Sequence, residues 1–543
     1  MKSHDVIVVG GGFAGMNAAI TAKLNGADVV LITKQHPLRS HSSSSHSGIN
    51  AALNVGDSVE QHIQDTLESG DGLCDSELVE KLCREAQEEV VRLDRWGVPF
   101  SRDASGLFDF VQFGGSSVAR TVFAGDAAGH FVLQVLYEQV LRLEIPVLQD
   151  CLVLSLIIAD DKCRGICYYN MPTGQTIAEQ ASAVVLATGG TNQIFGATSS
   201  ALSATGDGMA MAYRQGVPLM DMEFVQFHPT SLPGSGLVIT EMARSLGGRI
   251  VDKNNKALSS RPGLKGLELM NRNICSQTMV EAMNTKDDGN AVLFLDCSSI
   301  KKDVIKRQLY ETAAMVKDLQ GVKLTDGLIP ITPCAHRSLG GIKVAANGAT
   351  QIPGLFATGG CSCSGAHGAN QLGGNALLDN LVYGRATGIA SSDHASSTVA
   401  KDVSDTLAED QRKKLRRFAS RGTSAKDSQA AIRSELQAVM QDKVGVIRDK
   451  VALVETQGTI ESLQNRYDKI GIQKYGGTFN TELCSMVELG NLLEIAGATV
   501  ASALARTESR GNHYRSDYPK RDDKQWSKHT LVYREGLNHV IKH

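Results

Sequence analysis

Residues 6–15 read VIVVGGGFAG, and this stretch decides the fold. Its first four residues are all β-branched, which is typical of a buried strand. Glycines follow at Gly10, Gly12 and Gly15, in the spacing G-x-G-x-x-G. Between a strand and a helix, this spacing permits a tight turn whose backbone N–H groups approach a pyrophosphate. The stretch therefore predicts a dinucleotide-binding start, with Gly10, Gly12 and Gly15 at the cofactor.

The residues after this loop complete a β-α-β unit. A helix-like stretch covers residues 14–24 and a second apolar run covers residues 28–32, which is the signature of a parallel sheet. Thr33 and Lys34 stand where an NAD-binding protein carries an acidic residue for the ribose. We therefore expect Thr33 and Lys34 to contact a dinucleotide other than NAD.

Length and charge limit the classes of function. The chain has 543 residues, enough for two to four domains, and carries 55 basic and 58 acidic side chains. This balance gives no electrostatic reason to expect a nucleic-acid or membrane-surface partner. We find neither a signal peptide nor a run of about 18 uncharged apolar residues. We expect a cytoplasmic protein that meets a membrane only through partners.

The eleven cysteines are scattered along the chain. The closest spacings are C-x3-C at Cys163 and Cys167 and C-x-C at Cys361 and Cys363, and neither matches a zinc or iron–sulfur ligand set. We expect structural or free thiols in a reducing cytosol and no metal site.

Residues 221–230 read DMEFVQFHPT, and Thr240-Glu241 follows, so that an imidazole, a hydroxyl and a carboxylate stand in one segment. Other motifs are RSH at 39–41, FGG at 113–115, SALSATGDG at 200–208, TPCAHRSLGGI at 332–342, HGANQLGGNAL at 367–377 and a C-terminal GNHYRSDYPKRDDKQW at 511–526. Together these motifs resemble the flavoprotein subunit of succinate dehydrogenase and fumarate reductase, and the resemblance covers nearly the whole chain.

The resemblance and the β-α-β start imply an α/β fold. We expect a Rossmann-like FAD-binding domain with an inserted α+β capping domain, then a helical domain and a C-terminal tail. The expected boundaries are residues 1–225 and 338–398 for the FAD-binding domain, 226–337 for the capping domain, 399–495 for the helical domain and 496–543 for the C-terminal segment.

The resemblance also implies that the cofactor is FAD. His41 falls on the position at which the family bonds covalently to the flavin, and His46 is a second candidate. Asp207 is expected to be buried near the cofactor with hydrogen-bond donors around it, because an unpaired buried carboxylate is costly. The further residues expected at the cofactor are Ser40, Gly48, Asn375 and Leu377.

The family chemistry passes a hydride between flavin N5 and one carbon of the substrate and a proton to the neighbouring carbon. By resemblance, Arg272 delivers the proton and Glu241 and Arg244 relay it. An arginine acts as an acid only if its proton is restored at once, because its pKa is very high. The positions that bind substrate in the family are His228, Thr240 and His336.

One substrate position departs from the family. The family motif HGANRLGSNSL has an arginine that clamps a substrate carboxylate, and Gln371 replaces it here. A neutral amide cannot offer the charged, bidentate fork of a guanidinium. Either another cation compensates, or the group bound at Gln371 is not a carboxylate.

We therefore expect an FAD-dependent fumarate reductase or succinate dehydrogenase flavoprotein, with electrons exchanged through a separate iron–sulfur subunit. A first alternative keeps this chemistry for a different unsaturated acid, because of Gln371. L-aspartate oxidase is a less favoured alternative, because its flavin is not covalent and the RSH motif and tail argue against it. A non-catalytic electron-transfer flavoprotein is another, against which the retained His228, Glu241, Arg272 and His336 argue.

Overall fold

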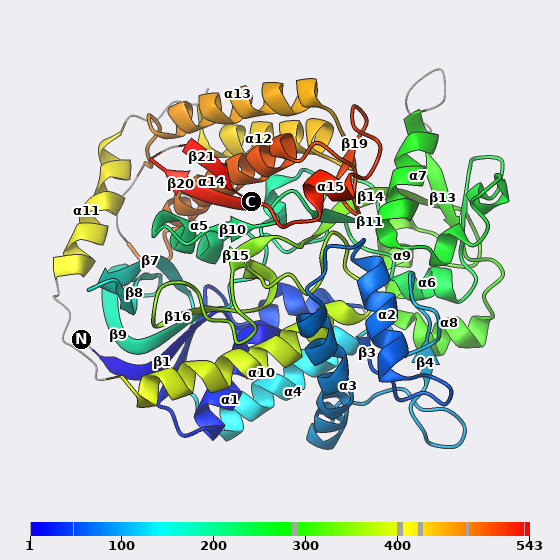
Figure 1. Ribbon diagram of the computed structural model, residues 1–543, viewed down its shortest axis with the longest axis horizontal. Helices are drawn as coiled ribbons and strands as arrows, with labels where there is room; N and C mark the ends of the chain where they lie inside the picture. The colour runs from blue at the N-terminus through cyan, green and yellow to red at the C-terminus, as the bar shows by residue number, and fades with distance from the viewer. Residues whose placement is uncertain are drawn as a thin grey trace.

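The computed structural model describes residues 2–46, 48–284, 292–398, 406–421, 427–473, 477–536 and 538–542. Its largest sheet consists of β1 (Ser3–Val9), β2 (Val29–Ile32), β6 (Val147–Leu148), β7 (Cys151–Ala159), β8 (Lys162–Asn170), β9 (Gln175–Leu186) and β16 (Leu355–Ala357). The strand order is β6-β2-β1-β9-β8-β7, and β16 pairs with β9 (Figure 1). Strands β6, β2, β1, β9 and β16 run parallel, whereas β7 and β8 form an antiparallel hairpin.

The glycine loop lies where β1 ends and α1 (Phe13–Leu24) begins. Gly10 has φ +113°, and a Cβ there would lie 2.2 Å from the carbonyl oxygen of Ala187 at the end of β9. A Cβ on Gly15 would lie 1.9 Å from the carbonyl oxygen of Gly10, so this glycine lets the helix pack closely on the loop. The predicted β-α-β start is confirmed.

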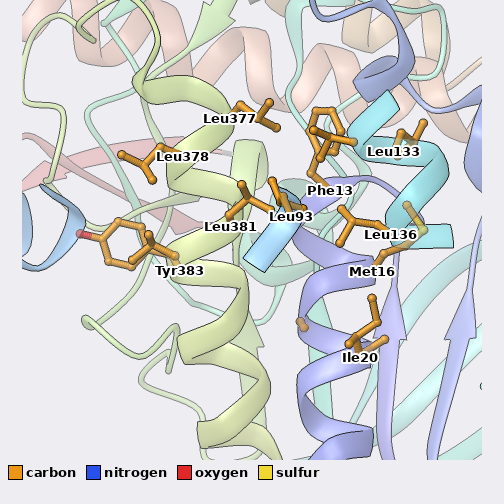
Figure 2. Close-up of a cluster of buried hydrophobic side chains, with 14 of the residues drawn as sticks. Phe13, Met16, Ile20, Leu93, Leu133, Leu136, Leu377, Leu378, Leu381 and Tyr383 are labelled. Atoms are coloured by element: carbon orange, nitrogen blue, oxygen red, sulfur yellow. The ribbon is translucent and has the colours of Figure 1, made fainter. Parts of the chain in front are cut away.

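Helix α1 packs against α10 (Asn375–Ser396), although some 360 residues separate them. Gly384 and Gly388 of α10 face the backbone of α1, where an added Cβ would lie 2.9 Å from Ala14 O and 2.5 Å from Ala18 O. Figure 2 shows the apolar cluster around this pair, to which α3 (Ser76–Trp96) and α4 (Ala128–Arg142) contribute Leu93 and Leu136. This packing fixes the N-terminus of α10 near the glycine loop.

In the sequence, the strands of a second sheet lie between β9 and β16 of the first sheet. The second sheet has the order β11-β14-β13-β12 and contains β11 (Val225–Ser231), β12 (Arg249–Val251), β13 (Leu293–Asp296) and β14 (Ile329–Ser338). The helices of this segment are α6 (Glu241–Ser245), α7 (Arg272–Asn284), α8 (Lys302–Gln308) and α9 (Tyr310–Gln320). Its apolar core is separate from the cluster around α1, so an inserted α+β segment is present as expected.

The C-terminal part contains helices and a hairpin. The helices are α11 (Thr406–Ser420), α12 (Gln429–Lys443), α13 (Lys450–Tyr467) and α14 (Thr481–Ala505). The hairpin of β20 (Leu531–Glu535) and β21 (Asn538–Lys542) joins β10 (Leu219–Met220), β15 (Gly341–Lys343) and β17 (Ser362–Cys363) in a third sheet. Helix α14 continues across the boundary expected at residue 495, so the helical and C-terminal segments share one helix.

Of the described helices, α14 is long and apolar enough to cross a membrane, but 67% of its apolar window is buried inside the protein. It packs against α13, α12 and α5 (Asp207–Arg214), as a core helix does. The remaining elements are short or peripheral: α2 (Val59–Ser69), β3 (Ile49–Asn50), β4 (Phe110–Val111), β5 (Thr121–Val122), β18 (Ile447–Arg448), β19 (Tyr514–Arg515) and α15 (Asp523–Trp526). The predicted fold class is confirmed.

Candidate active site

One cavity connects the glycine loop of the first sheet with strands β11 and β14 of the second. Most of the residues expected at the cofactor and substrate line its wall. They are Gly10, Gly12, Thr33, Lys34, Ser40, His41, Asp207 and Leu377 on the cofactor side, and His228, Thr240, Glu241, Arg272 and His336 on the substrate side.

The cofactor side fits FAD. The loop at Gly10 has no room for side chains, and the backbone N–H groups at the start of α1 border the cavity, as pyrophosphate binding requires. His41 lines the same wall, and its Nδ1 accepts a hydrogen bond from the backbone N–H of Ala201 at 3.3 Å. Burial, with the nearby charge of Arg337, lowers the pKa of His41 to about 4. His41 is therefore a neutral imidazole at neutral pH.

Lys34 and Asp207 form a buried pair beside the cofactor side. Lys34 Nζ lies 2.8 Å from Asp207 Oδ2 and 2.8 Å from Glu488 Oε1, and it also donates to Thr205 Oγ1. Burial opposes both charges, but the charges of Lys34 and Asp207 sustain each other: the pKa of Lys34 is raised and that of Asp207 lowered. Asn491 adds a further donor to Asp207, so the buried carboxylate has the donors that its burial requires.

Glu241 is the centre of the substrate side. Thr240 caps the N-terminus of α6 by accepting from the Met242 N–H, which places Glu241 in the first turn. Arg272 donates Nε–H and Nη2–H to Glu241 Oε2, at 2.8 and 2.6 Å, and Arg244 Nη2 lies 3.3 Å from Oε1. Burial opposes ionisation, but Arg272 and Arg244 hold the pKa of Glu241 below its ordinary value. A buried carboxylate therefore lies between two guanidinium groups.

His228 and His336 come from neighbouring strands, with ring centroids 5.1 Å apart. His228 Nδ1 accepts from the Thr230 N–H at 3.3 Å, which leaves the proton on Nε2 in the neutral ring. His336 Nδ1 lies 2.8 Å from Ser199 Oγ. Burial, and then the neighbouring positive groups, lower both pKa values well below 6.5, so both rings are neutral donors rather than cations.

Five of the expected residues lie behind the cavity wall. Gly15 packs α1 on the loop, and a Cβ on Gly48 would lie 2.1 Å from Val122 O. The Asn375 side chain is held by other side chains, Asn50, His62 and Thr66. Arg244 contacts Glu241 from behind, and the amide of Gln371 lies 2.8 Å from His367 Nε2. These residues position others rather than face the cavity.

Sequence reasoning missed two groups that matter to the site. Gln226 accepts from Arg272 Nη1–H at 3.0 Å and donates to the carbonyl oxygen of Gln371. It lies two residues before His228 in β11, and this strand spacing could have revealed it. Arg337 lines the cavity beside His336 and donates to Asp379, a pairing for which the sequence carries no local signal.

Of the eleven cysteines, Cys151 borders the cavity, and the other ten do not line it. All eleven are free, and burial raises the pKa of Cys361 and Cys363, so they are poor nucleophiles. Within the described residues no group of three or more His, Cys, Asp or Glu side chains is placed to hold a metal ion.

Comparison with known proteins gives the family. Residues 5–377 match a family model described as an FAD binding domain, and residues 433–542 match the fumarate reductase flavoprotein C-terminal model. The chain is 37% identical to a fumarate reductase flavoprotein subunit of Mycobacterium tuberculosis, over 98% of this chain and 95% of the relative. It is 36% identical to a succinate dehydrogenase flavoprotein subunit of Rickettsia felis, over 97% and 92% of the two chains.

A solved structure of a quinol fumarate reductase from E. coli superposes with a TM-score of 0.94 at 33% identity, over 100% of this chain and 97% of that chain. The fold, both family models and the full-length relatives agree with the cavity that joins a dinucleotide loop to the Glu241 site. The chain belongs to the family of FAD-dependent fumarate reductase and succinate dehydrogenase flavoprotein subunits.

Proposed function

We propose that this chain reduces the C=C bond of fumarate or a close dicarboxylate, or catalyses the reverse oxidation, with Arg272 as the proton donor. The observation that carries this proposal is the paired contact of Arg272 with Glu241 at the wall of the cavity, beside two neutral histidines. Bound FAD, once reduced by two electrons from the partner, would supply the hydride for the reduction, and the residues of the chain supply the proton and hold the substrate.

Arg272 donates its proton to the substrate carbon next to the one that receives the hydride. The guanidinium then recovers a proton from the Glu241 side, to which its Nε and Nη2 are already hydrogen-bonded. Arg244, close to the other carboxylate oxygen, is the next member of the relay. Gln226 accepts from Nη1 of Arg272 and fixes the plane of the guanidinium, so that the donor is in place before the substrate arrives.

The two histidines bind a carboxylate as neutral N–H donors. His228 has its Nδ1 occupied by the Thr230 N–H, so its Nε2–H is the group directed to the ligand. The Ser199 hydroxyl lies 2.8 Å from His336 Nδ1 and, as a donor to it, would leave Nε2–H for the ligand. Thr240, on the same wall, adds a hydroxyl. These hydrogen-bond donors are already in place around the negative charge of the carboxylate. They therefore lower the activation barrier without having to reorganise during the reaction.

We infer that FAD is bound covalently through His41. The ring is neutral, its Nδ1 accepts from the Ala201 N–H, and Nε2 is the nitrogen left for the bond. After acid precipitation, yellow colour is expected to stay with the wild-type protein and to leave His41→Ala. His46→Ala is the matched control, because that ring is the second candidate and is hydrogen-bonded to Asp126 O. Retention of colour by His41→Ala would overturn the assignment.

We also propose that a separate iron–sulfur subunit exchanges electrons with this chain. The relatives in the comparison are named as subunits, which supports an assembly of this kind. The expected place is the cytoplasm, with membrane contact through the partners. Purification of an active monomer free of iron–sulfur clusters, together with its natural electron donor, would contradict the proposal.

The test of function is oxidation of reduced viologen by the purified protein when fumarate is added. Rapid turnover is expected, and silence with every unsaturated acid tried would contradict the proposal. A second candidate, the same reaction on another unsaturated acid, is favoured by Gln371 alone. A panel of mono- and dicarboxylic acids separates the two, because the second candidate requires faster turnover of an acid with one carboxylate.

A further inference from the structure

The chain has lost a cation at position 371 and has one close by at position 337. Gln371 is buried behind the wall, and its amide lies against His367. Arg337 comes from β14, directly after His336, and lines the cavity. Both positions belong to one cluster, because Arg337 binds Asp379, and Asp379 lies 3.0 Å from His367. The charge is therefore present in the cluster, but it lies on strand β14 and not in the loop before α10 that carries Gln371.

A bulge in β14 explains why two consecutive residues reach the cavity. Gln226 of β11 pairs with Arg337, but the next residue, Phe227, pairs with Ala335, so His336 is the extra residue. In a regular strand, neighbouring side chains point to opposite faces, and a bulge breaks this alternation and redirects a side chain. His336 and Arg337 consequently line the same cavity.

The guanidinium of Arg337 has donors to spare. Nη2 donates to Asp379 Oδ2 at 2.9 Å and Nη1 approaches Ala376 O at 3.5 Å, whereas Nε is buried without a partner among the described residues. Its side chain is 17% exposed and that of Asp379 is 12% exposed. A buried donor without an acceptor is costly, and a ligand in the cavity would remove that cost.

The electrostatics of the cavity favour a dianion. Arg272 and Arg337 both line it, and the charge of Arg272 works with burial to lower the pKa of Arg337, whereas Asp379 opposes this. Two cations near one cavity repel each other, and a ligand with two negative charges relieves that repulsion. Each cation already has a carboxylate partner in the fold, Glu241 for Arg272 and Asp379 for Arg337, and a ligand with one carboxylate would interact with one of the two guanidinium groups only.

We infer that Arg337 binds one carboxylate of the substrate and replaces the arginine missing at position 371, so that it determines specificity for dicarboxylates. Asp379 and His367 hold the guanidinium in place. The inference rests on the proposed function, because it presumes that an unsaturated dicarboxylate occupies the cavity. It removes the conflict between Gln371 and a dicarboxylate substrate.

The test is a binding titration of the flavin-loaded protein with malonate, an unreactive dicarboxylate. The change in flavin absorbance measures the binding. Arg337→Gln is expected to raise the dissociation constant at least about 30-fold, by analogy with the loss of one partner from a buried charged contact. Propionate, which has one carboxylate, is expected to change by a much smaller factor. Arg385→Gln is the matched control, because Arg385 lies on the same helix as Asp379 and pairs with Glu88 and Glu89 on α3.

Two further variants guard against a simple folding defect. Arg337→Lys keeps the charge and is expected to bind malonate more tightly than Arg337→Gln. The double variant Arg337→Gln with Gln371→Arg moves the cation to the other position of the cluster, and it is expected to recover about tenfold or more of the lost affinity. Flavin content and the flavin midpoint potential are measured for each variant.

Each outcome has one meaning. If the wild type binds malonate and Arg337→Gln binds it equally well, Arg337 does not contact a carboxylate and the inference is wrong while the proposed function stands. If the flavin midpoint potential changes and the affinity for malonate does not, Arg337 acts on the cofactor, and the inference is again wrong. If the wild type binds no dicarboxylate, both the proposed function and the inference fail.

Discussion

Arg506 in the C-terminal segment and Arg337 at the cavity both bind buried carboxylates. They differ in how many of their N–H donors have a hydrogen-bond partner. Every N–H group of Arg506 has a partner: Glu223 at 2.6 Å, Glu508 at 2.9 Å, the carbonyl oxygens of Trp526 and Lys528, and Thr530 Oγ1. Arg337 keeps a buried Nε without a partner in the described part of the chain. A guanidinium whose donors are all used has none left for a ligand, whereas Arg337 has a buried donor without a partner and lines the cavity.

The same contrast separates the two regions more widely. Arg510 uses Nε and both terminal nitrogens on Glu508, Asp71 and Asp523. Behind the cavity wall, Arg244 donates Nη1–H to Glu268 O, but its Nε has no hydrogen-bond partner among the described residues. The buried arginines Arg506 and Arg510 are thus used within the fold, although their sequence reads as a charged tail suited to a partner.

The largest expected effect is on catalysis at Arg272. Arg272→Gln removes the proposed proton donor and leaves Glu241 facing a neutral amide, so we expect kcat to fall by about 10³-fold. Viologen-linked fumarate reduction at saturating substrate measures the loss. Arg385→Gln is the control and is expected to keep wild-type kcat, because Arg385 pairs with Glu88 and Glu89 of α3 and does not line the cavity. A fall of less than about tenfold would deny Arg272 its role as proton donor.

For Arg506, we expect a loss of stability and no loss of activity. Arg506→Met leaves Glu223 and Glu508 without their shared cation in a buried site, so the free energy of unfolding is expected to fall by about 3 kcal/mol. Urea denaturation measures this, and the folded fraction is expected to keep its kcat. A variant that is as stable as the wild type but inactive would break the distinction between the two regions.

A smaller, pH-dependent effect is expected at His529, next to this cluster. Its ring lies 2.6 Å from Asp221; burial lowers its pKa, but Asp221 raises it more, to a net value above 6.5. The stabilisation is therefore fully present below about pH 6.5 and is lost as pH rises through the raised folded-state value.

His529→Gln is expected to lose about 1 kcal/mol or less at pH ~6 and almost nothing at pH ~9. Urea titrations of wild type and variant at both pH values measure the difference. Tyr533→Phe on the following strand β20 is a control that leaves His529 and Asp221 in place. A difference that grew with pH would contradict the raised pKa of His529.

Much of the site could be predicted because its signals are local in sequence. The loop at Gly10 follows a run of β-branched residues, and Thr240 and Glu241 are adjacent at a helix start. These residues lie at one cavity because they stand at strand ends and helix caps. Short stretches of sequence determine both. The fold class was predictable for the same reason, because the β-α-β rhythm appears within 30 residues.

Arg337 could not be predicted in the same way. Strict alternation would have turned it away from His336, and the bulge that turns it inward arises from the pairing of β14 with β11, a hundred residues away. Asn375 shows the reverse: its place in a family motif suggested the cofactor, but Asn50, His62 and Thr66 use its side chain. In both cases, contacts between segments far apart in the sequence determine where the side chain lies.

The third sheet has a consequence for the order of folding. Strand β10 leads directly into Asp221 and the His228 strand, yet its partner β20 lies more than 300 residues later. The Asp221 backbone and side chain are both held from there, by Thr530 and His529. Contacts of such sequence separation form slowly, because the intervening chain must first be made and ordered. During translation, the segment that carries His228 must wait for residues 529–542 before this sheet can close.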